Sequence, residues 1–126
     1  FDIVVQAVNE PQGILLRGIE PAIGQALMHE HRGVTGVSLT NGPAKLVQAL
    51  GIHSRELDGQ PLEGNQLTVA LDQFKIPREI IATPRVGVNL SGKDGKKPWR
   101  FYVANNPYVS GMRKREIDLE THGWRD

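Results

Sequence analysis

The segment TNGPAKLVQALG, residues 40–51, contains the clearest secondary-structure signal in the chain. Pro43 suits the first position of a helix, and Gly51 suits the position just beyond its last turn. The apolar residues between them share one helical face: Leu46, Val47 and Leu50. Because a helix this short persists only when it packs against other elements, the segment predicts a helix within a folded core.

Working outward toward the N-terminus, the residues predict a hairpin and a second helix. Residues 2–8 and 13–19 are rich in β-branched residues and leucine, which predicts two strands with Pro11 in the turn between them. A helix is then expected to open at Pro21 and to stop at Gly33. The chain opens inside the first predicted strand, so we expect further sequence upstream.

Toward the C-terminus, strands are predicted at four places: residues 67–71, 80–83, 86–90 and 99–103. The charged residues from Gly111 onward are expected to fray. The expected fold class is therefore α+β: a single domain with short helices on a curved, mostly antiparallel β-sheet or open barrel. It would occupy residues 1–110, followed by a charged tail at 111–126.

Composition narrows the class of protein. The chain has 126 residues, of which 39% are hydrophobic and 23% charged, which is typical of a globular domain. No apolar run approaches the roughly 20 residues of a membrane-spanning helix, so no membrane partner is expected. Cysteine is absent, which excludes disulfides and thiolate metal sites. The net charge of +1 does not by itself indicate nucleic acid, so that function has to rest on local clusters.

The start of the predicted helix after Asn41 could bind a phosphate group. Unpaired backbone N–H groups at a helix N-terminus, here beginning at Gly42 and Pro43, attract anions. Thr40 and Asn41 add hydrogen-bonding side chains, and Lys45 adds a full positive charge one turn further on. The residues alone favour an ordinary helix start with a solvated lysine, because that arrangement is more common.

Two strand positions could also carry chemistry. Arg17 lies in the apolar run ILLRGI, where a charge is costly unless it is paired, and Glu20 is the adjacent candidate partner. It could instead point toward a phosphate or a reacting water. Gly87 follows Val86 among β-branched residues, which permits close approach of a ligand or marks a simple bulge.

A basic stretch near the C-terminus has aromatic neighbours: Lys93, Lys96, Lys97 and Arg100, with Trp99, Phe101 and Tyr102. This combination fits nucleic-acid binding, although a solvated loop beside core aromatics is the more common explanation. His29 and His31 fall on different faces of the predicted helix, so no metal site is expected there.

Four segments together resemble the alkyladenine (3-methyladenine) DNA glycosylases. ILLRGIEP at 14–21 is similar to that family's LLRALEP strand, and TNGPAKLVQALGI at 40–52 resembles its GPxKLxxALGI segment. IATPRVGVNLSG at 81–92 resembles its PRVGV block, and KPWRFYVANNPYVS at 97–110 resembles its closing PWRFYV and YVS motifs. The segments occur in family order with family-like gaps, and they correspond to the C-terminal two-thirds of the family domain.

The resemblance implies a mechanism and its residues. Such enzymes flip a damaged purine out of the duplex, and a carboxylate activates the water that breaks its N-glycosidic bond. No covalent intermediate, metal or cofactor is involved. Arg17 matches the arginine beside this water, the backbone carbonyl of Val86 matches a group that holds the water, and Gly87 follows along the pocket wall. The residues that match the family's contact to the DNA backbone are Lys45, Gly42 and Pro43, preceded by Thr40 and Asn41.

The chain also departs from the family pattern. The general-base glutamate of the family lies in an upstream E-x-E-A-Y segment that nothing in this chain matches. Asp2 falls where the family pocket has asparagine, and Arg55 stands near the position of a second DNA-contacting lysine.

The sequence therefore predicts part of a monofunctional glycosylase of base-excision repair, with damaged duplex DNA as partner. It would be intracellular and monomeric when joined to the rest of its domain. On its own this chain would be inactive. A non-catalytic nucleic-acid-binding β-domain is the main alternative, and a small-molecule transferase with a similar barrel is a third, because fold does not determine function.

Overall fold

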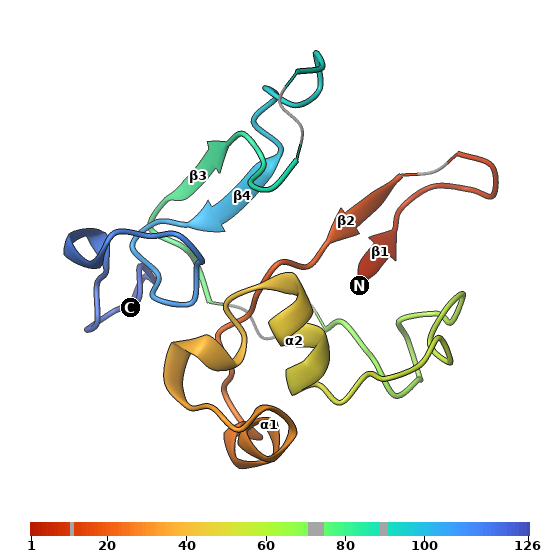
Figure 1. The fold of residues 1–126 in the computed structure, drawn as a ribbon, viewed down its shortest axis with the longest axis horizontal. Helices are drawn as coiled ribbons and strands as arrows, with labels where there is room; N and C mark the ends of the chain where they lie inside the picture. The colour runs from red at the N-terminus through yellow and green to blue at the C-terminus, as the bar shows by residue number, and fades with distance from the viewer. Residues whose placement is uncertain (11, 71–74, 89–90) are drawn as a thin grey trace. The chain divides into compact units, whose positions relative to one another are not determined.

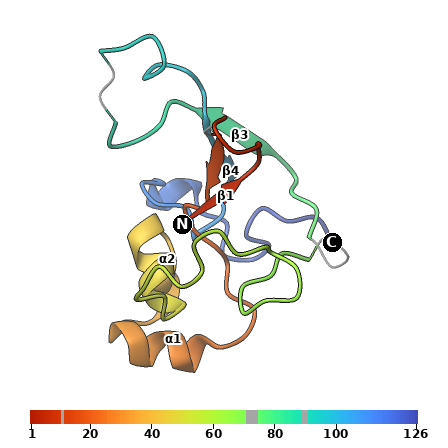
Figure 2. The same ribbon diagram turned by 90° about the vertical axis from the view of Figure 1, so that its right-hand side faces the viewer.

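A computed structural model describes residues 1–10, 12–70, 75–88 and 91–126. The chain divides into two compact units, Phe1–Asp72 and Gln73–Asp126. Among the described residues, each unit contains one two-stranded antiparallel sheet, and the α-helices belong to the first unit. Figure 1 shows these elements along the chain, and Figure 2 shows them from a second direction.

The first unit opens with a hairpin of β1, Asp2–Val4, and β2, Gly13–Leu15. The hairpin was predicted, but both strands are shorter than expected. The chain turns after β1, where the Glu10 N–H donates a hydrogen bond to the Ala7 carbonyl (3.0 Å). The predicted role of Pro11 lies outside the described residues.

The first helix, α1, spans Gln25–Arg32. It begins later than predicted, because Gly24 adopts a left-handed conformation with φ of 78° and the helix can start only after it. It ends where predicted. Gly33 also has a positive φ, and its N–H donates to the His29 carbonyl (2.6 Å), which closes the last turn.

The short helix η1, Gly36–Leu39, leads into α2, Pro43–Ala49. The predicted bounds of α2 are confirmed: proline occupies its first turn, and Gly51 follows it with a φ of 69°. Leu46 is fully buried, and a core cluster joins the helices: Met28, Leu39 and Ala49, covered by Ile19, Val34 and Leu50. Packing against α1 and η1 therefore stabilises a helix that is too short to form alone.

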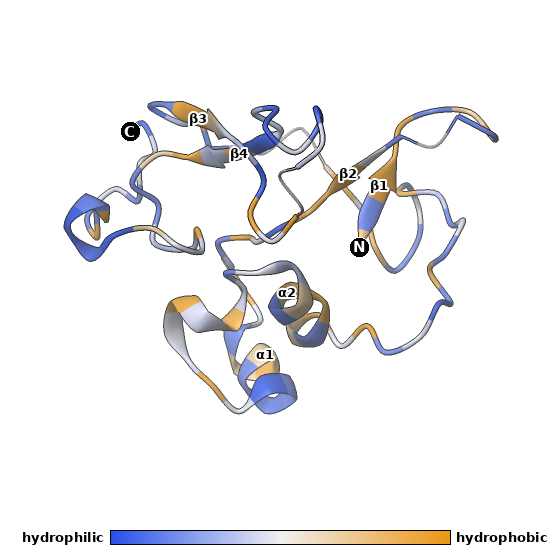
Figure 3. Ribbon diagram, turned by 45° about the horizontal axis from the view of Figure 1, so that its top comes forward, coloured by the Kyte–Doolittle hydropathy of each residue, from blue (hydrophilic) through white to orange (hydrophobic). Residues whose placement is uncertain are grey.

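The second unit contains the hairpin of β3, Ile80–Thr83, and β4, Arg100–Val103. Ile80 lies opposite Val103 and Thr83 opposite Arg100, so all four residues of each strand are paired. The predicted strand at 80–83 is confirmed. The predicted strand at 99–103 is also confirmed, except that Trp99 lies just before it. Figure 3 shows the strongly apolar character of β3.

Two further predicted strands do not form within the described residues. Residues 67–70 belong to an irregular loop, tied by a hydrogen bond from the Val69 N–H to the Leu62 carbonyl (3.3 Å). Residues 86–88 form bends, because Gly87 has a φ of 77° and interrupts the extended backbone. The remaining positions of these two predictions, 71 and 89–90, lie outside the described residues.

The charged C-terminal segment is folded, so the expectation that it frays from Gly111 is wrong. It contains the short helix η2, Lys114–Glu116. The Arg125 N–H donates to the Ile76 carbonyl (2.8 Å), and Trp124 forms a bridge with Pro77. These backbone contacts pair the end of the chain with the segment that precedes β3.

The observed class is mixed α+β, as predicted. The sheet arrangement differs from the prediction, because the described strands form two separate two-stranded sheets and no closed barrel is present among them. None of the helices in the described part of the chain is long and apolar enough to cross a membrane.

Candidate functional site

Four predicted site residues lie together where α2 begins. The Lys45 Nζ donates a hydrogen bond to the Asn41 Oδ1 (2.8 Å). The stem of Lys45 passes along Gly42, where an added Cβ would lie 3.5 Å from the Lys45 Cδ. The lysine is half-buried, and Pro43 occupies the first turn beside it. The arrangement holds one positive charge in a defined place at the helix start.

Thr40 has a structural position at the same helix start. It is fully buried, and its Oγ1 donates a hydrogen bond to the carbonyl of Ile19 (2.7 Å). Because Ile19 lies two residues after Arg17, this bond ties the segment that carries Arg17 to the beginning of α2. The hydroxyl proton of Thr40 is therefore used inside the core.

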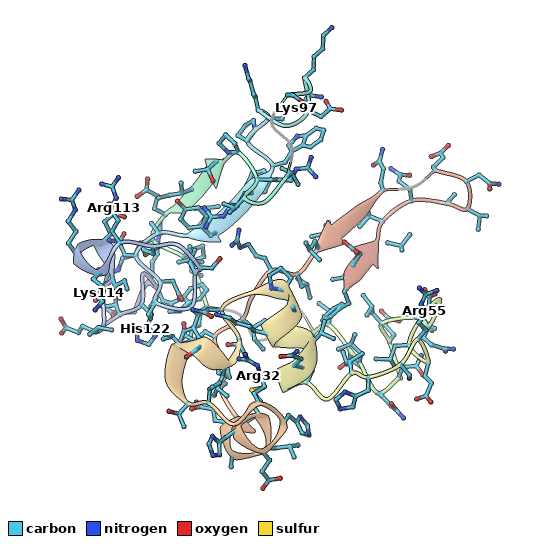
Figure 4. All side chains as sticks on the ribbon, viewed as in Figure 1. Arg32, Arg55, Lys97, Arg113, Lys114 and His122 are labelled. Atoms are coloured by element: carbon cyan, nitrogen blue, oxygen red, sulfur yellow. The ribbon has the colours of Figure 1, made fainter. Side chains whose placement is uncertain are left out.

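Arg17 lies outside a strand, because β2 ends at Leu15. It is half-buried, and both Arg17 and Glu20 take part in polar interactions, so neither is an unpaired charge. Asp2 is exposed on β1, opposite Leu15. Arg55 projects from the exposed loop after α2 (Figure 4).

Val86 and Gly87 belong to the second unit, whereas the other predicted site residues belong to the first. Val86 is exposed and lies in the bend after β3. The positive φ of Gly87 is a backbone conformation that glycine adopts at no steric cost.

The two histidines of α1 each contact a backbone carbonyl. The His29 Nδ1 lies 3.0 Å from the Val34 oxygen, and the His31 Nδ1 lies 2.9 Å from the Ala49 oxygen. Both therefore join α1 to neighbouring segments. Across the described ranges, no group of three histidine, aspartate or glutamate side chains is placed to bind a metal ion.

Arg32 is a structural residue that no sequence motif singled out. Its guanidinium donates hydrogen bonds to the carbonyls of Ser38 and Leu39, the latter at 2.9 Å. Its Nε lies 3.4 Å from the Gln48 Oε1 of α2. One cation thus connects α1, η1 and α2. Its partners lie up to 16 residues away, beyond the reach of a local pattern.

Arg100 differs from the lysines with which the sequence grouped it. It lies within β4, where its guanidinium donates to the Thr83 hydroxyl (3.2 Å) and the Ser110 carbonyl (2.8 Å). It also stacks 4.3 Å from the ring centre of Tyr102, and both residues line a cavity of about 150 Å³. Arg100 is therefore an anchor inside the second unit and not part of a solvated loop.

Asp118 closes a turn in the C-terminal segment. Its carboxylate accepts hydrogen bonds from the N–H groups of Glu120 (2.9 Å) and Thr121 (3.1 Å), and from the Thr121 hydroxyl. The Thr121 hydrogen bonds are the main reason that the pKa of Asp118 is lowered to about 2.

Comparison with known proteins gives a single family. The model of the methylpurine-DNA glycosylase (MPG) family matches residues 1–107. A relative from Latilactobacillus sakei, provisionally named 3-methyladenine DNA glycosylase, is 47% identical over 125 residues. Relatives with the same provisional name are 44% identical in Lactiplantibacillus plantarum and 41% identical in Enterococcus faecalis.

The alignments cover nearly all of this chain but only part of each relative. They include 98% of this chain for the first two relatives and 100% for the third. The chain spans 59% of the length of the first two relatives and 55% of the third.

Proposed function

The chain belongs to the methylpurine-DNA glycosylase family, and on that premise we propose that it acts within a longer glycosylase of base-excision repair. The proposed reaction is hydrolysis of the N-glycosidic bond of alkylated or deaminated purines. The observation that carries this proposal is a family match over residues 1–107, which includes three of the four motifs in full and most of the fourth, all in family order.

The proposed chemistry follows from the bond that breaks. The damaged base is flipped into a pocket, and a water attacks the sugar carbon while the base leaves. A carboxylate general base removes a proton from that water. In the family this group is a glutamate in the E-x-E-A-Y segment, which has no match in residues 1–126. The rest of the family domain would have to supply it.

Three residues of this chain are proposed to act on the reacting groups and the DNA. The guanidinium of Arg17 would orient the water and the phosphate of the flipped nucleotide. By family likeness, the backbone carbonyl of Val86 would accept a hydrogen bond from the attacking water. Lys45 would contact a backbone phosphate, and its defined position beside Asn41 supports this role.

Other proposed contacts come from the family likeness alone. They are Asp2 and Gly87 at the pocket wall, Arg55 on the DNA backbone, and Thr40, Asn41, Gly42 and Pro43 around Lys45. The buried hydroxyl of Thr40 supports a positioning role rather than direct contact. We also propose that the protein is intracellular and monomeric. Its strands would join a larger curved sheet, because a two-stranded hairpin is only marginally stable alone.

A chimera tests the proposal. The part of the Latilactobacillus sakei relative outside the aligned 125 residues would be fused to this chain to give the completed chimera. We expect the completed chimera to release hypoxanthine or 3-methyladenine from a duplex under single-turnover conditions. The 126-residue chain alone should release neither, because loss of a general base costs about a hundredfold to ten-thousandfold.

The full-length relative serves as the positive control, and a cooperative melting transition shows that the chimera folds. A folded chimera that binds duplex DNA without releasing a base would favour the non-catalytic nucleic-acid-binding domain. Base release by the 126-residue chain alone would show that the general base has been assigned wrongly.

A further inference from the structure

The loop between β3 and β4 concentrates positive charge. Residues 84–100 contain five basic residues and one acidic residue, whereas the whole chain has a net charge of only +1. Arg100 is anchored in β4, so four cations remain in the loop. We name this group, together with one aromatic residue, the basic tip: Arg85, Lys93, Lys96, Lys97 and Trp99.

Trp99 organises two of these cations. The residue is 50% exposed, with the Lys97 Nζ 4.5 Å and the Arg85 guanidinium carbon 5.6 Å from its ring centre. The two cations come from opposite ends of the loop, so the indole brings together charges that are 12 residues apart in sequence. Such cation–π contacts already restrict the long basic side chains, so these side chains lose less conformational entropy when they bind a ligand.

Backbone hydrogen bonds form turns within residues 92–99 of the loop. The Gly95 N–H donates to the Gly92 carbonyl (3.1 Å), and the Trp99 N–H donates to the Lys97 carbonyl (2.8 Å). These turns present the lysines outward, and Figure 4 shows Lys97 at the end of the loop, away from Arg113 and Lys114.

The single carboxylate of the loop neutralises only part of this charge. Asp94 forms an ion pair with Lys97 (2.6 Å). The Lys97 hydrogen bond lowers the pKa of Asp94, with a smaller contribution from the charge of Arg85. Lys93 and Lys96 are exposed, and in the described part of the chain no carboxylate pairs with either. The tip therefore keeps a net positive charge that Asp94 only partly balances.

We propose that the basic tip is a sequence-independent contact for the phosphate backbone of duplex DNA, additional to the residues assigned to base excision. The choice of DNA as the polyanion rests on the proposed function. Phosphate contact is favoured over stacking on an unpaired base, because the only aromatic ring of the tip already contacts two cations.

The test uses the 126-residue chain and an undamaged, fluorescently labelled 20-base-pair duplex. Binding is followed by anisotropy over a series of salt concentrations. In the double variant Lys96→Ala/Lys97→Ala, the slope of log K against log salt should become shallower by about 1.8, because each lost phosphate contact contributes about 0.9. The matched control, Arg113→Ala/Lys114→Ala, removes the same charge at the start of η2 and should keep the original slope.

The variant Trp99→Leu tests the contribution of the indole ring separately from that of the charges. Every cation of the tip is kept, so the salt slope should stay unchanged, while the affinity falls severalfold because Arg85 and Lys97 are no longer held in place. Melting curves of each variant establish that the fold is intact, which we expect because these side chains are exposed.

Several outcomes would overturn the proposal. These are a lysine variant with the slope of the control, a wild-type chain that does not bind the duplex even at low salt, or binding to phosphatidylserine vesicles instead of DNA. Binding only to a single-stranded 20-mer, lost in Trp99→Leu, would overturn it in favour of base stacking. This experiment does not measure base excision. A chimera that fails to excise would therefore contradict the proposed function without contradicting a slope effect at the basic tip. An unchanged slope would likewise contradict the proposal for the basic tip without contradicting base excision.

Discussion

At the scale of single residues, two half-buried arginines of the first unit illustrate different uses of a guanidinium group. Arg32 is committed to backbone carbonyls that connect three helical segments. Arg17 lies in the irregular segment after β2, which a Thr40 hydrogen bond ties to the start of α2. A residue that joins elements should affect stability, whereas a residue that serves a reaction should affect the rate.

We therefore expect Arg17→Ala in the completed chimera to slow base excision by about a hundredfold while changing the melting temperature little. Arg17→Lys should recover only part of the rate, because lysine keeps the charge but lacks the planar fork. Single-turnover excision at saturating enzyme separates chemistry from binding. Arg32→Ala is the structural control and should lower the melting temperature. A normal rate in an easily unfolded Arg17→Ala protein would make Arg17 a structural ion-pair partner instead.

The proposed role of Lys45 predicts an effect on DNA binding and not on the rate of base excision. Lys45→Ala in the completed chimera should weaken binding to damaged and undamaged duplexes alike, because a phosphate contact carries no sequence information. The salt slope should become shallower by about 0.9, which corresponds to one phosphate. Lys114→Ala removes an equal charge elsewhere and serves as the control. If the Lys45→Ala slope equals that of the control, Lys45 is an ordinary helix-surface lysine.

At the scale of elements, the C-terminal segment is irregular, but its backbone is hydrogen-bonded to another part of the second unit. Its backbone pairs with the residues before β3 through Trp124 and Arg125. The Arg78 N–H also donates to the Gly123 carbonyl (2.9 Å). Gly123 packs so closely that a Cβ there would overlap the Ala104 carbonyl oxygen. This close approach requires glycine.

Two glycines with the same backbone conformation allow this packing to be measured. Gly123 and Gly111 both have a φ of 77°, but a Cβ added at Gly111 would meet nothing within 4 Å. Gly111→Ala should therefore cost about 1 kcal/mol of conformational strain alone. Gly123→Ala should cost clearly more, because backbone must move to relieve the overlap. Urea denaturation of both variants compares them, and equal losses would mean that the segment is not packed as described.

At the scale of the whole chain, the buried apolar side chains of the described residues are few: Met28, Leu39, Leu46, Ala49 and Ala104. Large apolar side chains on both hairpins are exposed, among them Val4 (73%), Ile80 (61%) and Phe101 (59%). Burying such a side chain contributes about 1.5–3 kcal/mol. The chain also spans only about three-fifths of the length of its relatives.

We therefore expect the completed chimera to unfold at a higher temperature than this chain, because the added part would cover the apolar faces of the hairpins. Ile80→Thr tests this cause directly. In the chain alone the substitution should leave the melting temperature nearly unchanged, whereas in the chimera it should lower it. Equal effects in both proteins would show that β3 stays exposed when the rest of the family domain is present.

The features that were predicted correctly depend on short-range constraints. The bounds of α2 follow from the fixed φ of Pro43 and the positive φ available to Gly51, and both act within one or two residues. The family could also be identified from the sequence, because the four motifs are compared residue by residue with those of the family and this comparison requires no knowledge of the fold. At the described residues 86–88, the predicted strand does not form, because the β-branched pattern on either side of Gly87 carries no information on the φ that this glycine adopts.

The sequence by itself determined the α+β class, the helix α2 and the family. Only the tertiary structure decided that Thr40 is buried against Ile19, that Arg100 is an anchor while Lys97 lies on an exposed tip, and that the charged C-terminal segment is folded. The physical reason is the distance along the chain between partners. The Arg78 Nε, for example, donates to the carbonyl of Trp124, 46 residues away. Such a contact depends on chain packing, which a local pattern of residues does not specify.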